Sequence, residues 1–187
     1  MSRWPSDGRE RLRQAALELF AEQGFAATTV PEITARAGLT TRTFFRHFPD
    51  KRAVLFVDED EISEMVARLM AEAPAAVEPM ALIRDGLRVL AETRFEGRRP
   101  ELRARRALVA TDAGLQERDL RKRAAMAEAI RTGFLTRGID ASRAALLGEV
   151  CATVLSLSIE EWLDSDDPRT LDHVVQATFD TLRAELG

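Results

Sequence analysis

Apolar positions near the start of the chain recur with the spacing of an α-helix. The first series stands at relative positions i, i+3, i+4, i+7 and i+8, and consists of Leu12, Ala15, Ala16, Leu19 and Phe20. Side chains with this spacing share one face of a helix, which is typical of a helix packed on a core. Gly24 follows and can take the left-handed conformation that often ends a helix. We therefore predict a helix that ends just before residue 24.

Two shorter helices are predicted immediately after it. Thr29, followed three residues later by Glu32, makes a capping box, which marks the start of a helix of about eight residues. Gly38 ends this helix, and Thr40 is a suitable N-cap for a third helix of similar length. Two short helices joined by a glycine-centred turn form a helix-turn-helix, whose second helix can enter the major groove of DNA.

The third helix is expected to have two chemically different faces. Phe44 and Phe48 are four residues apart, so we expect them in the core. The remaining face carries hydroxyl, guanidinium and aromatic groups, from Thr41, Arg42, Phe45 and Arg46. Arginine binds guanine or phosphate, threonine contacts phosphate or a thymine methyl, and an aromatic ring packs on the DNA backbone. Each of these side chains is also compatible with an ordinary solvated position, and Phe45 with a buried one.

Beyond residue 52 the apolar pattern predicts helices separated by short breaks. They are expected at residues 53–72, 80–95, 100–110, 114–134, 141–163 and 168–186. We see no strand pattern, so the predicted fold class is all-α. Residues 1–52 form a three-helix helix-turn-helix domain in this prediction, and residues 53–187 form a helical C-terminal domain. Within residues 141–163, Leu146, Val150 and Leu157 extend the apolar stripe, which favours contact with two partners.

The two parts of the chain differ in net charge. Residues 1–52 carry nine Lys or Arg against six Asp or Glu, a balance of +3, whereas residues 53–187 have a balance of −7. A cationic N-terminal unit on an acidic body favours contact of that unit with a polyanion, and a chance distribution is the alternative.

Composition argues against several other classes of protein. No apolar run reaches the roughly 18 residues of a membrane span, and the start lacks the apolar core of a signal peptide, so we expect a cytoplasmic protein without membrane contact. A single cysteine, Cys151, and two histidines without a nearby cysteine argue against a disulfide, a metal site or a cofactor. The acidic cluster in residues 160–167 lacks a histidine, and the chain lacks a nucleophile elbow or a phosphate-binding glycine loop. We therefore expect no enzyme activity.

The N-terminal region resembles the DNA-binding domain of the TetR (tetracycline repressor) family of bacterial transcription regulators, over residues 15–55, AALELFAEQGFAATTVPEITARAGLTTRTFFRHFPDKRAVL. This resemblance implies a homodimer that binds a pseudo-palindromic operator in double-stranded DNA, with residues 40–48 at the recognition helix. It implies DNA contacts at Thr28, Thr29, Thr40, Thr41, Arg42, Thr43, Phe45, Arg46, His47 and Lys51. For Thr28 and Thr29, helix capping alone is an alternative explanation.

By the same resemblance, three of these positions have distinct roles. Arg42 is the best candidate for a base contact, and Lys51 is expected to bind a phosphate at the start of the next helix. Phe45 stands where the family usually has a tyrosine that donates a hydrogen bond to phosphate. The chain contains no tyrosine, so this contact is lost, and we expect Arg46 or His47 to compensate.

The resemblance also assigns roles to the C-terminal domain. Its last two helices form the dimer interface, and its interior binds a small apolar effector that releases the repressor from DNA. Candidate effector contacts lie on the apolar faces and in an arginine-rich stretch, at Met65, Leu69, Ile83, Leu87, Leu90, Arg94, Arg98, Met126, Ile130, Phe134, Leu155 and Trp162. Residues 100–118, PELRARRALVATDAGLQER, weakly resemble regulators of acyl-CoA-like ligands, whose phosphates the arginines would bind unless they pair with acids. A helical dimeric interaction or ligand-binding module without specific DNA binding is the alternative function.

Overall fold

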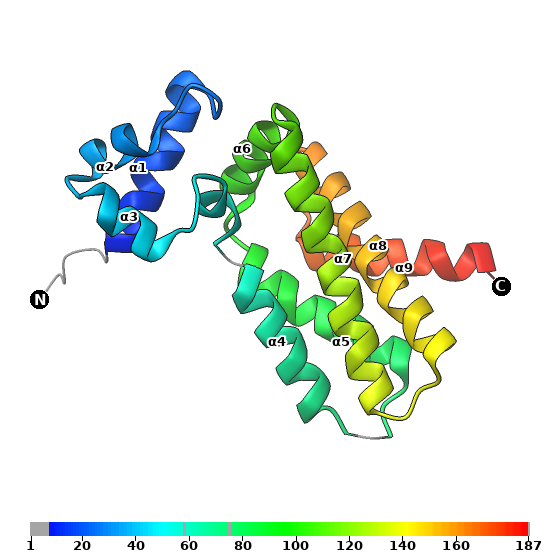
Figure 1. Ribbon diagram of the computed structural model, residues 1–187. Helices are drawn as coiled ribbons and strands as arrows, with labels where there is room; N and C mark the ends of the chain where they lie inside the picture. The colour runs from blue at the N-terminus through cyan, green and yellow to red at the C-terminus, as the bar shows by residue number, and fades with distance from the viewer. Residues whose placement is uncertain (1–7, 58, 75, 187) are drawn as a thin grey trace, which may run out of the picture. The chain divides into compact units, whose positions relative to one another are not determined.

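Every regular element described in the computed structural model is helical, which confirms the predicted all-α fold (Figure 1). The structure describes residues 8–57, 59–74 and 76–186. The packing divides the chain into two units, and both are discontinuous in sequence. The first unit holds residues 1–58 and 104–117, and the second holds residues 59–103 and 118–187.

This division differs from the predicted domain boundary after residue 52. Residues 53–56 are all buried in the core of the first unit, and Val109 and Leu115 belong to that same core. Helices α6 (Arg99–Ala110) and α7 (Ala113–Thr136) each continue from one unit into the other. The boundary could not be placed from local patterns because these contacts join segments about 50 residues apart.

Local sequence signals determine the first helices of the first unit. These elements are α1 (Gly8–Gln23), α2 (Val30–Ala37), α3 (Thr41–His47) and the 3-10 helix η1 (Arg52–Phe56). The capping box is present, because the Glu32 backbone N–H donates to the Thr29 hydroxyl and the Thr29 backbone N–H donates to the Glu32 carboxylate. Gly38 has φ 63° and ends α2, and the Thr40 hydroxyl accepts from the backbone of Thr43 at the start of α3. The predicted helix-turn-helix is thus confirmed.

One predicted helix is divided in two. Residues 53–72 were expected to be continuous, but the structure has η1 followed by a separate helix, α4 (Glu59–Glu72). Residues 53–56 of η1 are all buried, whereas the buried residues among the described side chains of α4 recur every fourth position, at Ile62, Val66 and Met70. The Asp50 carboxylate accepts a 2.8 Å hydrogen bond from the Ala53 backbone and caps η1. Burial on every side suits a short turn inside the core of the first unit better than a one-sided helix.

The second unit contains the longer helices. Besides α4 and parts of α6 and α7, it holds α5 (Pro79–Leu90), the π-helical turn η2 (Ala91–Phe95), α8 (Ala141–Asp164) and α9 (Leu171–Leu186). The helix predicted at residues 80–95 therefore changes from α to π at residue 91. The last helix was predicted to start at Pro168 but starts at Leu171. The Thr170 hydroxyl accepts from the His173 backbone, and the Asp167 carboxylate accepts from the Arg169 backbone, so a capped turn precedes α9.

One face of helix α8 packs into the core of the second unit. Ala144, Leu147, Cys151 and Leu155 are buried on its inner face and pack into one cluster with residues of α4, α5, α7 and α9. Gly148 lies so close to α7 that an added Cβ would be 2.4 Å from the backbone oxygen of Ala127.

The expectation that no apolar segment is long enough to span a membrane is wrong for helix α8. It has 24 residues, and its most apolar window has a mean hydropathy of 1.4, so by length and composition alone it could cross a membrane. Of that window, 44% is buried inside the protein. Because core helices meet the same criteria, this is weak evidence for a membrane contact.

Candidate functional site

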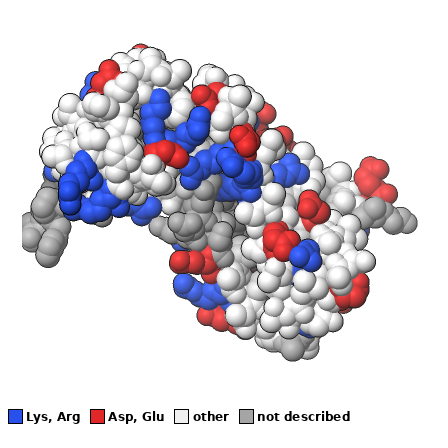
Figure 2. Space-filling model, in the orientation of Figure 1, with Lys and Arg blue, Asp and Glu red and all other residues white. Residues whose placement is uncertain are grey.

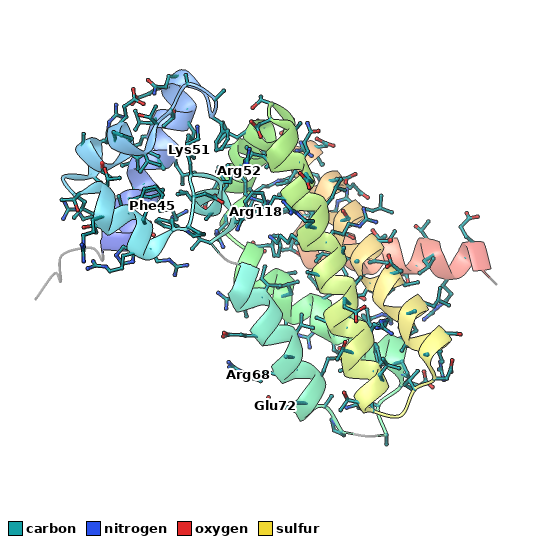
Figure 3. All side chains as sticks on the ribbon, in the orientation of Figure 1. Phe45, Lys51, Arg52, Arg68, Glu72 and Arg118 are labelled. Atoms are coloured by element: carbon teal, nitrogen blue, oxygen red, sulfur yellow. The ribbon has the colours of Figure 1, made fainter. Side chains whose placement is uncertain are left out.

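Helix α3 presents one face to the core and the other to solvent. Phe44 is fully buried, and its ring centre lies 5.4 Å from that of the buried Phe48. Phe45 meets the Phe44 ring edge-on at 5.5 Å between centres but is 55% exposed, and is labelled in Figure 3. Thr41, Arg42 and Arg46 are also exposed. The two faces predicted for this helix are therefore present.

Cationic side chains gather on the part of the first unit that holds α3 (Figures 1 and 2). Within the part of the chain that the structure describes, the Arg42 side chain has no hydrogen-bond or ion-pair partner. The Arg46 guanidinium lies 3.4 Å from Nε2 of the half-buried His47. An exposed guanidinium that no protein group holds in place is available to a base or a phosphate.

The threonines have different environments. Thr40 and Thr43 share a 2.9 Å hydrogen bond between their hydroxyl groups at the exposed start of α3. The Thr29 hydroxyl is exposed but donates to the Glu32 carboxylate at 2.7 Å. Thr28 is 1% exposed, and its hydroxyl donates to the backbone oxygen of Gly24 at 2.8 Å. Burial in the loop between α1 and α2 keeps the Thr28 side chain from the surface, and its contact with DNA stays a prediction.

Lys51 is held by the protein itself. Its ammonium group donates to the backbone oxygens of Phe25 and Thr28, both at 2.6 Å, and lies 4.2 Å from the centre of the Phe25 ring. Burial lowers the pKa of Lys51, and the nearby Asp112 carboxylate acts in the opposite direction. Lys51 thus joins the loop between α1 and α2 to η1, and its contact with a DNA phosphate stays a prediction.

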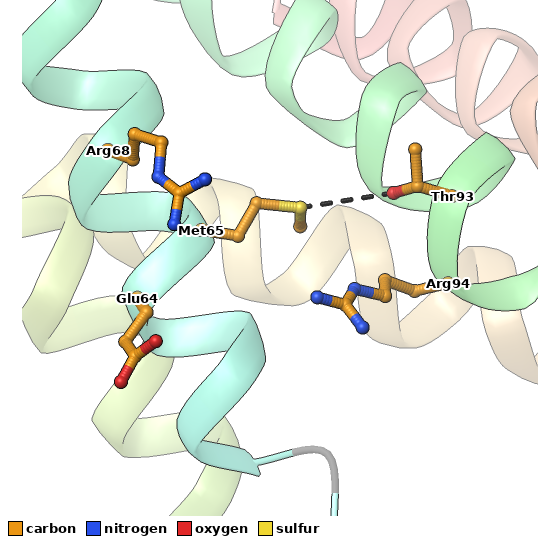
Figure 4. A pocket seen from close by; sticks show the side chains of 5 residues that line it. All are labelled: Glu64, Met65, Arg68, Thr93 and Arg94. Atoms are coloured by element: carbon orange, nitrogen blue, oxygen red, sulfur yellow. Dashed lines mark hydrogen bonds between the residues drawn. The ribbon is translucent and has the colours of Figure 1, made fainter. Parts of the chain in front are cut away.

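A second candidate site is a pocket in the second unit. It has a volume of about 320 Å³, and its lining residues are Glu64, Met65, Arg68, Thr93 and Arg94 (Figure 4). Only Met65 and Arg94 were predicted as effector contacts. The prediction did not include the other three, because it was based on apolar stripes and most residues that line this pocket, on α4 and η2, are polar.

Most of the remaining predicted effector contacts lie inside the core. The buried ones pack in the same cluster and are Ile83, Leu87, Leu90, Ile130, Phe134, Leu155 and Trp162. Leu69 and Met126 are partly buried. Contact of these residues with a ligand stays a prediction, and it requires the core helices to separate.

The arginine-rich stretch is used largely within the protein. Arg99 donates to the backbone oxygens of Trp162, Ser165 and Asp167, and Arg103 donates to those of Leu163 and Ser165. These groups lie at the C-terminal end of α8, where backbone carbonyls lack partners inside the helix. Arg98 pairs with Glu101 at 3.1 Å. Arg99 and Arg103 thus cap the C-terminal end of α8.

Within the described ranges, residues suited to metal or thiol chemistry do not form a site. Among the residues that the structure describes, no group of three or more His, Cys, Asp or Glu side chains is placed to hold a metal ion. Burial raises the pKa of the Cys151 thiol to about 12, so the reactive thiolate is absent at neutral pH.

Sequence comparisons find related regulators. The model of the bacterial regulatory proteins of the tetR family matches residues 12–56. The HTH-type transcriptional repressor Rv3405c of Mycobacterium tuberculosis (strain ATCC 25618 / H37Rv) is 41% identical over 85 residues, which are 45% of this chain and 45% of that protein. The HTH-type transcriptional regulator TcmR of Streptomyces glaucescens is 31% identical over 189 aligned positions, which cover 95% of this chain and 84% of that protein. The match with Rv3405c thus spans less than half of that relative, whereas the match with TcmR spans most of both chains.

Two solved structures of transcriptional regulators have a similar fold. Thermus thermophilus FadR, a TetR family transcriptional repressor in complex with lauroyl-CoA, matches with a TM-score of 0.56 and 27% identity, over 93% of this chain and 92% of that one. A TetR transcriptional regulator from Legionella pneumophila matches with a TM-score of 0.58 over 97% of this chain and 99% of that one. The Legionella protein is 15% identical and supports the fold alone.

Proposed function

Because this chain belongs to the tetR family of bacterial regulatory proteins, we propose that it is a cytoplasmic transcriptional repressor that binds operator DNA as a homodimer and is released by a small apolar effector. The observation that carries the proposal is the exposed face of α3, where Thr41, Arg42, Phe45 and Arg46 lie opposite the buried Phe44. Relatives described as HTH-type transcriptional regulators or repressors support the same function. We propose that the protein is not an enzyme.

Replacing Arg42 with alanine is expected to weaken binding to the preferred operator by about 1–3 kcal/mol. The exposed guanidinium lies near the start of α3, and the family resemblance implies that this position contacts base edges. Affinities for the operator and for unrelated DNA should be measured at one fixed salt concentration, with Arg88→Ala on the exposed side of α5 as a charge-matched control. Equal losses on both kinds of DNA would show that Arg42 binds a phosphate and does not read a base.

Replacing Lys51 with alanine is expected to have two effects. The Phe25 and Thr28 carbonyls lose their donor, which should lower the stability of the first unit by about 1–3 kcal/mol. If Lys51 also binds a DNA phosphate, the salt dependence of binding should flatten by about one unit of slope. Urea unfolding and DNA binding at several salt concentrations separate the two effects. Lower stability with an unchanged slope would assign Lys51 a purely structural role.

Helices α8 and α9 are the proposed dimer interface. The side chains of Leu146 and Leu157 on α8 are 64% and 51% exposed, and Val150 between them is half-buried. Exposed large apolar side chains on one helix are typical of a protein–protein contact. The Ser158 and Thr178 hydroxyls share a 3.0 Å hydrogen bond, which joins α8 to α9 within one chain. Light scattering during size-exclusion chromatography should therefore give the mass of a dimer.

The effector is proposed to be an acyl-CoA-like molecule or another ligand with an apolar chain. This part of the proposal is supported by the similarity to FadR, which was solved in complex with lauroyl-CoA. The apolar residues of the second unit that surround Leu87 and Phe134 would contact the chain once the core opens.

Operator selection from a random duplex library is the experiment that tests the proposed function. Enrichment of a two-fold symmetric site, with binding that weakens steeply as salt rises, is the expected result. If no sequence is enriched and binding stays weak at low salt, the alternative of a dimeric interaction or ligand-binding module replaces the repressor.

A further inference from the structure

Helix α6 belongs to both units of the chain. Residues 99–103 are part of the second unit and residues 104–110 are part of the first, yet the helix is continuous from Arg99 to Ala110 (Figure 1). Leu102 packs against the core cluster of the second unit, whereas Val109 is buried in the core of the first. These 12 residues rise by about 18 Å along one axis, and the hydrogen bonds of the helix make them move together.

The N-terminal half of α6 is fixed to the end of α8. Arg99 donates to the backbone oxygen of Trp162, and its guanidinium lies 5.2 Å from the centre of the Trp162 ring. Arg103, one turn later, donates to the backbone oxygen of Leu163 at 2.7 Å. The buried Trp162 ring also donates its indole N–H to the backbone oxygen of Arg169 at 3.0 Å. A shift of α6 would therefore change the surroundings of Trp162.

The C-terminal half of α6 is fixed to η1. Nε of Arg105 donates to the backbone oxygen of Leu55 at 2.9 Å, and the Arg105 guanidinium lies 4.7 Å from the centre of the Phe56 ring. Leu55 and Phe56 are both buried in the core of the first unit. Because a guanidinium combines hydrogen bonding with stacking on an aromatic ring, Arg105 has two contacts with one short element. We therefore expect η1 and α6 to shift together.

Element η1 is connected to the DNA-binding face by a short, well-held segment. Residues 48–51 separate α3 from η1. Within them, the buried Phe48 packs on Phe44 of α3, and the Asp50 carboxylate caps η1. Lys51 is bound to the loop between α1 and α2. Binding of α3 to DNA therefore acts on η1 through residues that are buried or hydrogen-bonded.

We infer that α6 transmits operator binding at α3 to the end of α8, with Arg105 as the positioning residue in the first unit and Arg99 and Arg103 in the second. This inference rests on the proposed function, because it requires the first unit to bind an operator. Coupling between two sites is reciprocal, so a change at the end of α8 also changes the affinity for the operator. Because α8 is part of the proposed dimer interface, α6 links the association of two copies to operator binding.

The fluorescence of Trp162 tests this transmission directly. The chain has two tryptophans, so Trp4→Phe leaves Trp162 as the emitting residue. Saturation of this variant with the operator selected from the random library is expected to change the Trp162 emission, whereas an unrelated duplex at the same concentration should not. If the anisotropy of a labelled operator reports binding while the emission stays constant, the inference is overturned and the proposed function stands. Absence of operator binding would contradict both.

Arg105→Gln, in the Trp4→Phe background, tests the contact with η1. This variant should lose most of the change in Trp162 emission at operator saturation, and Arg105→Lys, which keeps a cation near the Phe56 ring, should retain more of it. A purely structural role of Arg105 would lower stability and operator affinity but leave the emission change at saturation intact. That result would overturn the inference.

Arg103→Gln tests the reciprocal effect from the second unit. It should weaken operator binding about two-fold to ten-fold. Arg169→Gln is the matched control, because Arg169 pairs with Asp167 and Glu161 at the same end of α8 but is not part of α6. Its operator affinity should equal that of the unsubstituted protein. Light scattering shows whether each variant is still a dimer at the concentration used. Equal losses in both variants, or no loss in Arg103→Gln, would overturn the inference.

Discussion

Replacing Phe44 with alanine is expected to unfold the first unit and to abolish operator binding. The ring is fully buried and packs against Phe48 and Phe45, at centre-to-centre distances of 5.4 and 5.5 Å. Removing a buried phenylalanine costs about 3–5 kcal/mol, which is a large part of the stability of a small unit. Urea unfolding followed by circular dichroism measures this loss. No other substitution considered for the first unit removes as much buried apolar surface.

Phe45 provides the matched control on the same helix. Its side chain is 55% exposed, so Phe45→Ala should change the stability by less than about 1 kcal/mol and should weaken DNA binding only. If Phe44→Ala keeps full stability and binds DNA normally, the buried face of α3 is assigned incorrectly. If Phe45→Ala also unfolds the unit, then Phe45 belongs to the core rather than to the DNA-binding face.

The second large effect is expected from Gly148→Val in the second unit. An added Cβ would lie 2.4 Å from the Ala127 backbone oxygen, and a backbone atom cannot move aside as a flexible side chain can. Helices α7 and α8 would have to separate, and overpacking of this severity costs about 3 kcal/mol or more. A lowered midpoint of thermal unfolding relative to the unsubstituted protein is the expected result.

Ala145→Val is the control for this substitution. Ala145 lies three residues earlier on α8 and is half-buried, so the same β-branched side chain has more room there. We expect a change of less than about 1 kcal/mol. Equal destabilisation by both variants would show that valine disfavours the helix itself and that the close approach to α7 is unimportant.

The helix-turn-helix could be predicted from the sequence because its signals are local. The capping box at Thr29 and Glu32, the glycine at position 38 and the N-cap at Thr40 act within a few residues of their own helices. The burial of Phe44 and the exposure of Phe45 likewise follow from helical spacing.

Contacts between distant segments explain what the sequence did not predict. Lys51 binds backbone oxygens more than 20 residues away, and the burial of Thr28 depends on the same loop. Arg99 caps the end of a helix more than 60 residues away, so a charged cluster in the sequence becomes a set of capping groups in the fold. Three of the five residues that line the pocket beside Met65 were not predicted, because polar residues on two separate elements form most of its lining. None of these arrangements leaves a periodic pattern along the chain.

The sequence separation between the two parts of the first unit affects the order of folding during translation. Val109 and Leu115 complete the core around Leu12 and Phe20, but they leave the ribosome long after residue 58. Until they emerge, the nascent helix-turn-helix exposes apolar surface that the finished protein buries, and such surface makes a nascent chain prone to aggregation. Slow translation between codons 58 and 117 would prolong that exposure, so the yield of native protein depends on the rate at which this stretch is synthesised.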